Sequence, residues 1–228
     1  RPTEASGLLE VWLKQATACV IDDFPTYYPR HVLETALQFN TCELHVVDSN
    51  GFMAMRAQGR DFTTAYSLRR HLHKTILEHM YEFPLANPLD NARDLPMIDA
   101  TLIEDIFAKS NTPLTPYEYL WRVAEGGDIG KSALSTLKID HTVPPVLTKK
   151  GGSVEARRRW KKFLRQRLVN YNELRNQPQE NGASGISPWL HFGHIGVHQI
   201  INEIFTAYRW DVSMVTPPND GRRNGWWG

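Results

Sequence analysis

The first fifty residues alternate between helical and strand-like hydrophobic patterns. Apolar positions recur at helical spacing over residues 7–18 and again over 31–39. Each pattern is followed by a strand-like run, at 19–21 and at 43–47, and the first of these has the short apolar pattern of a buried parallel strand. Helix, strand, helix and strand at this spacing predict a doubly wound, Rossmann-like α/β sheet.

Polar residues follow both predicted strands. Asp22 and Asp23 end the first, and Asp48 and Asn50 belong to a strong turn signal after the second. Ligands of doubly wound sheets bind beyond the carboxyl ends of the strands, so these side chains lie at the edge where a ligand is expected. The same residues also suit caps and turns that serve the fold alone, and the sequence leaves both interpretations open.

The middle of the chain contains one clear helix and long irregular connections. Residues 62–80 carry apolar side chains at helical spacing. Residues 84–116 alternate proline, asparagine and aspartate around one short predicted helix, 100–109, which is typical of a connection between domains. A second polar stretch, rich in proline and lysine, spans 141–152.

Helical patterns dominate the last third of the chain. Residues 154–174 predict one long helix, whose buried stripe consists of Trp160, Phe163, Leu164, Leu168, Tyr171 and Leu174. A short helix is expected from Ser187-Pro188 to Gly193, and another from 197 to 208. We therefore predict an α/β domain over 1–112, an interdomain linker over 113–150 and a helical domain over 151–228.

The turn before Ser187 has the chemistry of an anion site. Ser187 is a good N-cap, and Pro188 suits the first helical position because no N–H is needed there. The small residues from Gly182 to Gly185 let a ligand approach the backbone closely. Free amides at a helix start attract phosphate, so the pattern predicts a phosphate-bearing ligand. Tyr171, at the end of the long predicted helix, is placed to reach such a ligand.

Charge is distributed unevenly along the chain. The net charge is +1, yet residues 149–167 hold nine Lys and Arg and a single acid. Such a basic stripe on a nearly neutral protein suits contact with a nucleic-acid backbone. A solvated helix face is an equally simple interpretation.

Three other features of the sequence do not lead to a functional assignment. The run from Glu125 to Ser132 looks like a P-loop tail, but glutamate occupies the position of the first glycine, so we expect a surface loop. His191, His194 and His198 have metal-like spacing, but glycines interrupt the helix between them, and we assign no metal ligand and no catalytic residue. Cys19 and Cys42 are expected to be reduced buried thiols, and no apolar run approaches a membrane span.

The stretch from Tyr171 to Gly193 resembles the start of the FAD-binding helical domain of the DNA photolyase/cryptochrome family. Family members carry a tyrosine and, twelve residues later, a run of the type T/L-S-x-L-S-P-Y-L-H-F-G. Here Tyr171 precedes Ala183 by that interval, and residues 183–193 are ASGISPWLHFG. The segments RNQP and VVDSNGFM are most similar to the class II cyclobutane-dimer group. Ala183 lacks the family's hydroxyl and Gly185 replaces a longer polar side chain, but both positions keep their backbone N–H donors.

The resemblance implies a light-driven enzyme that splits cyclobutane pyrimidine dimers in damaged DNA by electron transfer from FAD. It places the flavin against Tyr171, Ala183, Ser184, Gly185, Ile186 and Ser187. The DNA backbone would contact the basic residues Arg157, Arg158, Lys161, Lys162 and Arg165. Whether the chain also binds an antenna chromophore of the folate or deazaflavin type stays open, because no motif specifies such a site.

The same resemblance leaves two alternatives. One is a cryptochrome-like blue-light receptor without repair activity, and the other is an incomplete fragment that holds no flavin. Compared with the family, the chain is expected to be truncated at both ends, to lack the first strand of the sheet and to contain only the first part of the all-α FAD-binding domain. We expect a monomer outside the membrane, in the cytoplasm or, in a eukaryote, the nucleus.

Overall fold

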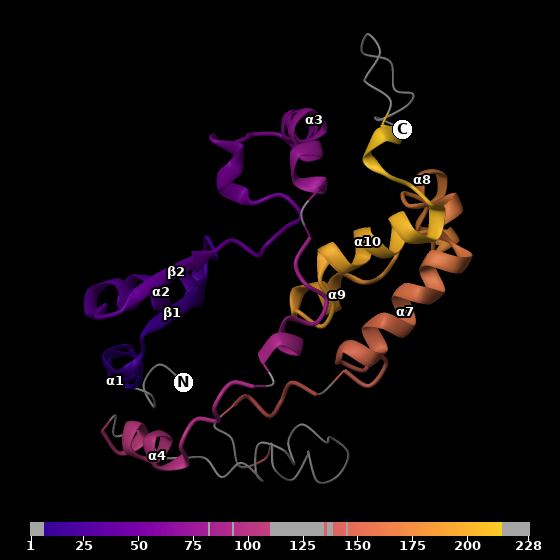
Figure 1. Cartoon of the computed structure of the whole chain (residues 1–228). Coiled ribbons are helices and arrows are strands. Elements are labelled where there is room, and N and C mark those ends of the chain that lie inside the picture. The colour runs from indigo at the N-terminus through magenta and orange to yellow at the C-terminus, as the bar shows by residue number, and fades with distance from the viewer. Residues whose placement is uncertain are drawn as a thin grey trace. The chain divides into compact units, whose positions relative to one another are not determined.

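The computed structural model describes residues 7–81, 83–92, 94–109, 135, 139–144 and 146–215 (Figure 1). Its helices and strands are α1 (Leu8–Gln15), β1 (Ala18–Asp22), α2 (Tyr27–Phe39), β2 (Glu43–Val47), α3 (Ala65–Thr75), α4 (Ala100–Lys109), α7 (Ser153–Gln166), α8 (Tyr171–Leu174), α9 (Ser187–His191) and α10 (Val197–Tyr208). Short 3₁₀ turns are η1 (Met55–Gln58), η2 (Ile76–Met80), η3 (Pro88–Ala92), η4 (Leu168–Asn170), η5 (Pro178–Glu180) and η6 (Val212–Met214).

The two strands predicted from the sequence form one parallel sheet. Their register runs from Ala18 opposite Glu43 to Asp22 opposite Val47. Parallel strands need a crossover between them, and α2 provides it. The structure therefore confirms an α/β arrangement in the first part of the chain, followed by a helical part.

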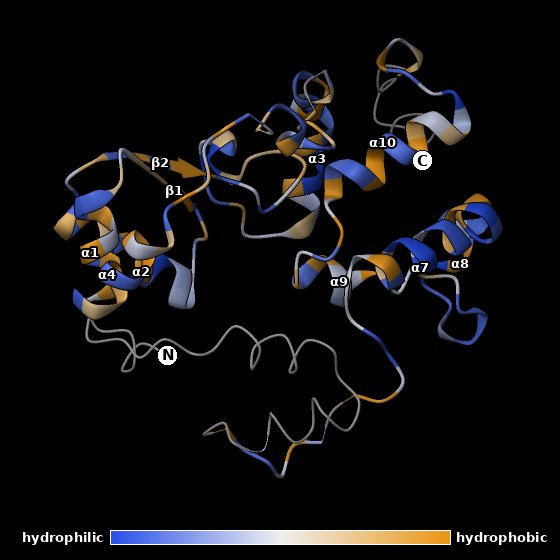
Figure 2. Cartoon of the chain, turned by 60° about the horizontal axis from the view of Figure 1, so that its bottom comes forward, coloured by the Kyte–Doolittle hydropathy of each residue, from blue (hydrophilic) through white to orange (hydrophobic). Residues whose placement is uncertain are grey.

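The prediction that the first strand is buried is wrong. Exposed and half-buried residues alternate along β1, and Val20 is 69% exposed. Hydrophobic residues nevertheless line both strands (Figure 2). The hydrophobic pattern therefore predicted the strands correctly. Their burial depends on how many other elements cover the sheet, which the local pattern does not specify.

Two details near the sheet also differ from expectation. Helix α2 begins at Tyr27, and Pro29 lies in its first turn, where a missing N–H costs no hydrogen bond. Helix α4 has the predicted bounds, but it packs against α1 and buries Ile106, so it belongs to this compact part of the molecule. Cys19 and Cys42 are free, half-buried thiols.

The chain folds into two compact units made from interleaved segments. One combines residues 1–47 with 93–146, and the other combines 48–92 with 147–228. The predicted domain boundaries instead divide the chain consecutively, and they stay a prediction. The P-loop-like run at 125–132, most of the expected linker at 113–150 and the segment from 216 to the end lie outside the described residues.

The second unit joins the segment after β2 to the helices at the end of the chain. The rings of Phe52 and His198 lie 5.1 Å apart, and those of Phe83 and Phe205 lie 6.1 Å apart. Both contacts bring residues from before α4 onto α10. Within the described ranges, no helix combines the length and the apolar character that a membrane crossing requires.

Candidate functional site

The helix predicted over residues 154–174 is interrupted. Helix α7 ends at Gln166, Arg167 adopts φ −129° and ψ −18°, and the chain then passes through η4 into the four-residue helix α8. The prediction of one continuous helix is therefore wrong, and Tyr171 begins a helix instead of ending one. Apolar spacing does not reveal the break, because the turns on both sides of it continue to present apolar residues at similar intervals.

Tyr171 sits at the edge of the helical core with its hydroxyl free. Its ring meets Phe163 edge-on, with centroids 5.6 Å apart and an interplanar angle of 89°. The guanidinium of Arg175 lies 6.0 Å from the ring centroid. The residue is 37% exposed, and its hydroxyl has no hydrogen-bond partner among the described residues. The phenol is thus held in place by its ring while its oxygen stays available to a ligand.

Two contacts hold the following turn against α8. Arg167 donates from Nη1 to the carbonyl oxygen of Asn181 at 2.9 Å. A Cβ on Gly182 would lie 2.4 Å from the carbonyl oxygen of Leu174, so only glycine allows the backbone to come this close. The turn therefore lies directly beside the short helix that carries Tyr171.

The backbone after this contact presents unpaired amides. The N–H groups of Ala183, Ser184, Gly185 and Ser187 find no acceptor in the part of the chain that the structure describes. Gly185 has φ +65°, and nothing lies within 4 Å of the position where its Cβ would be. Consecutive free donors beside open space suit an oxyanion such as a diphosphate.

The predicted capping role of Ser187 is wrong. Ile186 occupies the N-cap, Ser187 is the first helical residue, and its hydroxyl forms no capping hydrogen bond. Instead, the hydroxyl of Ser184 accepts from the amide of Ile186 at 3.4 Å, which shapes the turn one step earlier. Helix α9 has five residues, so its dipole is small, and the loop amides themselves are the donors.

A packed core supports this turn. Ile186 belongs to a buried cluster with Ala156, Trp160, Phe163, Trp189 and Ile195. Trp189 also donates from Nε1 to the carbonyl oxygen of Lys150 at 3.0 Å, and the guanidinium of Arg159 lies 4.7 Å from its ring centroid. The residues next to the free amides are thereby fixed, which keeps the donors oriented before any ligand binds.

The basic residues of α7 are not equivalent. Glu155 forms ion pairs with Arg158 at 2.7 Å and with Arg159 at 2.8 Å. The Arg158 hydrogen bond is the largest cause that lowers the pKa of Glu155 to about 2. Lys161, Lys162 and Arg165 have no carboxylate partner in the described ranges. The spacing of Glu155 from both arginines was the sequence signal that could have separated these two groups.

The three histidines near α9 have different surroundings. His194 accepts at Nδ1 from the amide of Gly152 at 3.1 Å. His198 packs against Phe52 and Phe83, which also contact each other, and His191 lies edge-on to Phe192. His194 also lies near Phe192, with ring centroids 6.1 Å apart. No group of three possible metal ligands occurs among the described residues.

The polar residues that follow the two strands form hydrogen bonds to nearby backbone. One carboxylate oxygen of Asp48 accepts from the amide of Met55 at 2.6 Å, and the other accepts from that of Asn50 at 3.3 Å. Asp22 ends β1, and Asp23, which is 7% exposed, donates its amide to Val47 at 2.7 Å. The turn interpretation is supported for Asp48, and a ligand at this edge stays a prediction.

Comparison with known proteins adds one finding to this geometry. No protein-family model matches the chain. Over 68 residues it is 32% identical to a deoxyribodipyrimidine photo-lyase from Potorous tridactylus. The matched stretch spans 30% of this chain and 13% of that relative. Together with the motif at Tyr171 to Gly193, this match supports a relationship between the chain and the photolyase family.

Proposed function

We propose that this chain is part of an FAD-dependent photolyase of the class II type, which repairs cyclobutane pyrimidine dimers in DNA. The observation that carries the proposal is the set of free amides at Ala183, Ser184, Gly185 and Ser187, in a turn that packs against α8, the helix that begins at Tyr171. The chain's match covers 13% of its relative, so activity, cofactor and substrate are all parts of this proposal.

The residues present fit the diphosphate of FAD. The amides would donate to the phosphate oxygens, Gly185 leaves open space for them, and the Tyr171 hydroxyl would donate from the neighbouring helix. When bound, FAD would supply the light-excited electron that opens the cyclobutane ring. The protein's own share is to bind the cofactor, orient it and exclude water from it.

Contact with DNA completes the proposal. A dimer must leave the base stack to reach a cofactor inside the protein. Arg157, Lys161, Lys162 and Arg165 are the predicted DNA contacts that have no carboxylate partner in the described ranges. We propose Arg157 and Lys162 for the phosphate backbone, because Lys161 and Arg165 line a separate hollow together with Glu203. Arg158, already paired with Glu155, would contribute less.

Titration of the purified chain with FAD tests the cofactor site. We expect saturable binding, followed by flavin absorbance or fluorescence, and about tenfold weaker binding for Tyr171→Phe, because a hydrogen bond to a charged group is lost. Tyr81→Phe is the matched control, since Tyr81 is 72% exposed and lies outside the turn. Failure to bind flavin, or equal losses in both variants, would reject the proposed site.

A second experiment addresses the substrate. A duplex with one cyclobutane dimer is expected to bind more tightly than the same duplex without it. Illumination of the flavin-loaded complete protein is expected to restore the pyrimidines, whereas this chain alone is expected to be inactive. Flavin binding without any preference for the dimer would instead favour a light receptor of the cryptochrome kind.

A further inference from the structure

A hollow lies between α7 and α10, in the unit that combines residues 48–92 with 147–228. It has a volume of about 620 Å³ and is lined by Lys161, Leu164, Arg165, Glu203, Thr206, Ala207 and Tyr208. None of these residues belongs to the turn at Ala183–Ser187 or to α8. Pockets that bind small molecules have volumes of about 300–1,000 Å³, so this hollow is large enough for such a ligand.

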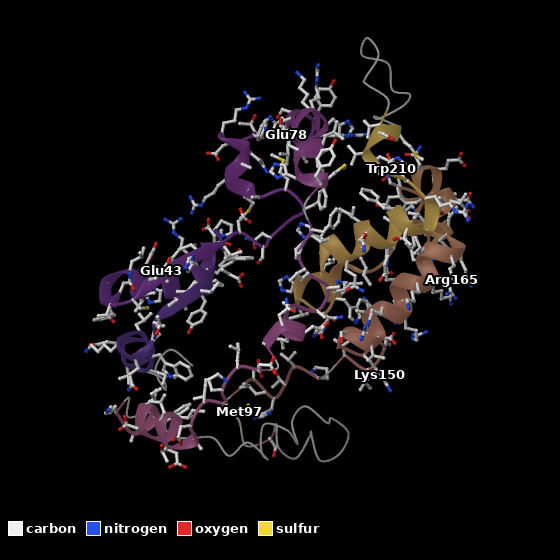
Figure 3. The ribbon with its side chains drawn as sticks, in the orientation of Figure 1. Glu43, Glu78, Met97, Lys150, Arg165 and Trp210 are labelled. Carbon is white, nitrogen blue, oxygen red and sulfur yellow. The ribbon has the colours of Figure 1, made fainter. Side chains whose placement is uncertain are left out.

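One wall of the hollow carries two cations. Lys161 and Arg165 are one helical turn apart on α7, and neither forms an ion pair or hydrogen bond with another described residue. Arg165 lies near the end of α7, at the right of the view in Figure 3. An ammonium and a guanidinium at this spacing can hold one phosphate group from two sides.

The opposite wall carries different chemistry. Glu203 of α10 accepts from the side-chain amide of Gln199 at 2.9 Å and forms no ion pair with either cation. Tyr208 ends the same helix with a side chain that is 51% exposed. Leu164 and Ala207 supply apolar surface between the walls. A carboxylate on this wall repels a continuous phosphate backbone but accepts hydrogen bonds from sugar hydroxyls.

We propose that the hollow between α7 and α10 binds a ribonucleotide. Lys161 and Arg165 hold its terminal phosphate, Glu203 accepts from its ribose hydroxyls, and the ring of Tyr208 stacks on its base. The two cations, the carboxylate and the aromatic ring of the lining then each match one group of the ligand, while the Thr206 hydroxyl donates to the carbonyl oxygen of Asn202 at 2.9 Å. This site is separate from the proposed flavin turn and requires no flavin, so either proposal can fail without the other.

Adenosine monophosphate is the probe that tests this site. Calorimetric titration of the whole chain is expected to give saturable binding, weakened about tenfold or more by Lys161→Gln and by Arg165→Gln. Lys74→Gln removes the same charge from an exposed position of α3 outside the hollow and should change the dissociation constant less than about twofold. Tyr208→Ala should weaken binding about fivefold or more, and Tyr208→Phe should retain it. Helical circular dichroism checks that each variant is folded.

The sign of the Glu203→Gln effect separates a ribonucleotide from a DNA strand. For a ribonucleotide, the substitution weakens binding, and deoxyadenosine monophosphate binds the unaltered protein more weakly than its ribose counterpart. If a DNA strand occupies the hollow, Glu203→Gln strengthens the binding of oligothymidylate, because a repulsive charge is removed. That result, an equal loss in Lys74→Gln, or no saturable binding of adenosine monophosphate would overturn the proposal.

Discussion

The two compact units of this chain bury their hydrophobic residues very differently. In the unit that contains the sheet, Leu13, Ala36 and Ile106 are buried, yet Val20 in β1 is 69% exposed. In the helical unit, Trp160, Phe163 and Trp189 are each at most 3% exposed and belong to one cluster. The proposed flavin turn packs against this buried aromatic cluster.

The difference concerns how well each unit can hold a ligand-binding geometry. Large aromatic side chains in one close-packed cluster restrict the backbone that carries them. Ile186 belongs to that cluster and lies within the turn. Its buried side chain therefore restricts the backbone that carries the neighbouring amides. The sheet of the first unit has no comparable cluster among the described residues. We therefore expect substitutions in the helical unit to have the larger effects on stability and on binding.

Trp189→Ala is expected to have the largest effect. It removes a buried indole, its hydrogen bond to Lys150 and the cation stacked on it, and should lower the free energy of unfolding by about 3–5 kcal/mol. Val20→Ala in the sheet should change it by less than about 0.5 kcal/mol, because Val20 is exposed. Urea denaturation measures both. Similar losses for the two variants would show that the units do not differ as described.

Gly182→Ala should have an intermediate effect. The added Cβ would meet the carbonyl oxygen of Leu174 at 2.4 Å, so the turn must move away from α8, at a cost of about 1–3 kcal/mol. FAD affinity should fall with it, because the amides shift relative to Tyr171. Gly196→Ala is the control, since nothing lies within 4 Å of its Cβ position. Unchanged stability and flavin affinity in Gly182→Ala would contradict the proposed packing of the turn.

A small pH effect is expected from Glu155. Its pKa is lowered from 4.5 to about 2 by Arg158 and Arg159, so its ion pairs stabilise α7 fully above about pH 4.5. This contribution should be lost progressively as the pH falls from about 4.5 toward 2. Glu155→Gln should therefore reduce the loss of stability in that window, as followed by thermal unfolding at each pH. An identical pH dependence in the variant would show that the ion pairs contribute nothing.

Local patterns were sufficient for much of the secondary structure. The bounds predicted for 43–47 and 100–109 coincide with β2 and α4, because a short apolar run between turn signals and a periodic run have few alternative conformations. The break at Arg167 and the position of Ser187 inside α9 were missed. Both depend on contacts between residues distant in the sequence, such as that of Arg167 with Asn181, which no local window contains.

The candidate site, too, was predictable from the sequence only in part. The residues from Tyr171 to Ser187 were selected from spacing and resemblance, and the glycines at 182 and 185 already indicated a close approach of backbone. Only the tertiary structure reveals that the amides are free and that Gly182 abuts Leu174. It also reveals that the hydroxyl of Tyr171 has no partner among the described residues. The hollow between α7 and α10 was not foreseen, because its two walls lie about forty residues apart in the chain.

By itself, the sequence determined most of the strands and helices, which residues carry charge and which family the turn resembles. These properties depend on side-chain chemistry and on spacing over a few residues. The tertiary structure decided which apolar faces are covered, which cations remain unpaired and which donors are left free. Those outcomes depend on contacts between distant segments, because burial and hydrogen bonding are satisfied across the whole fold.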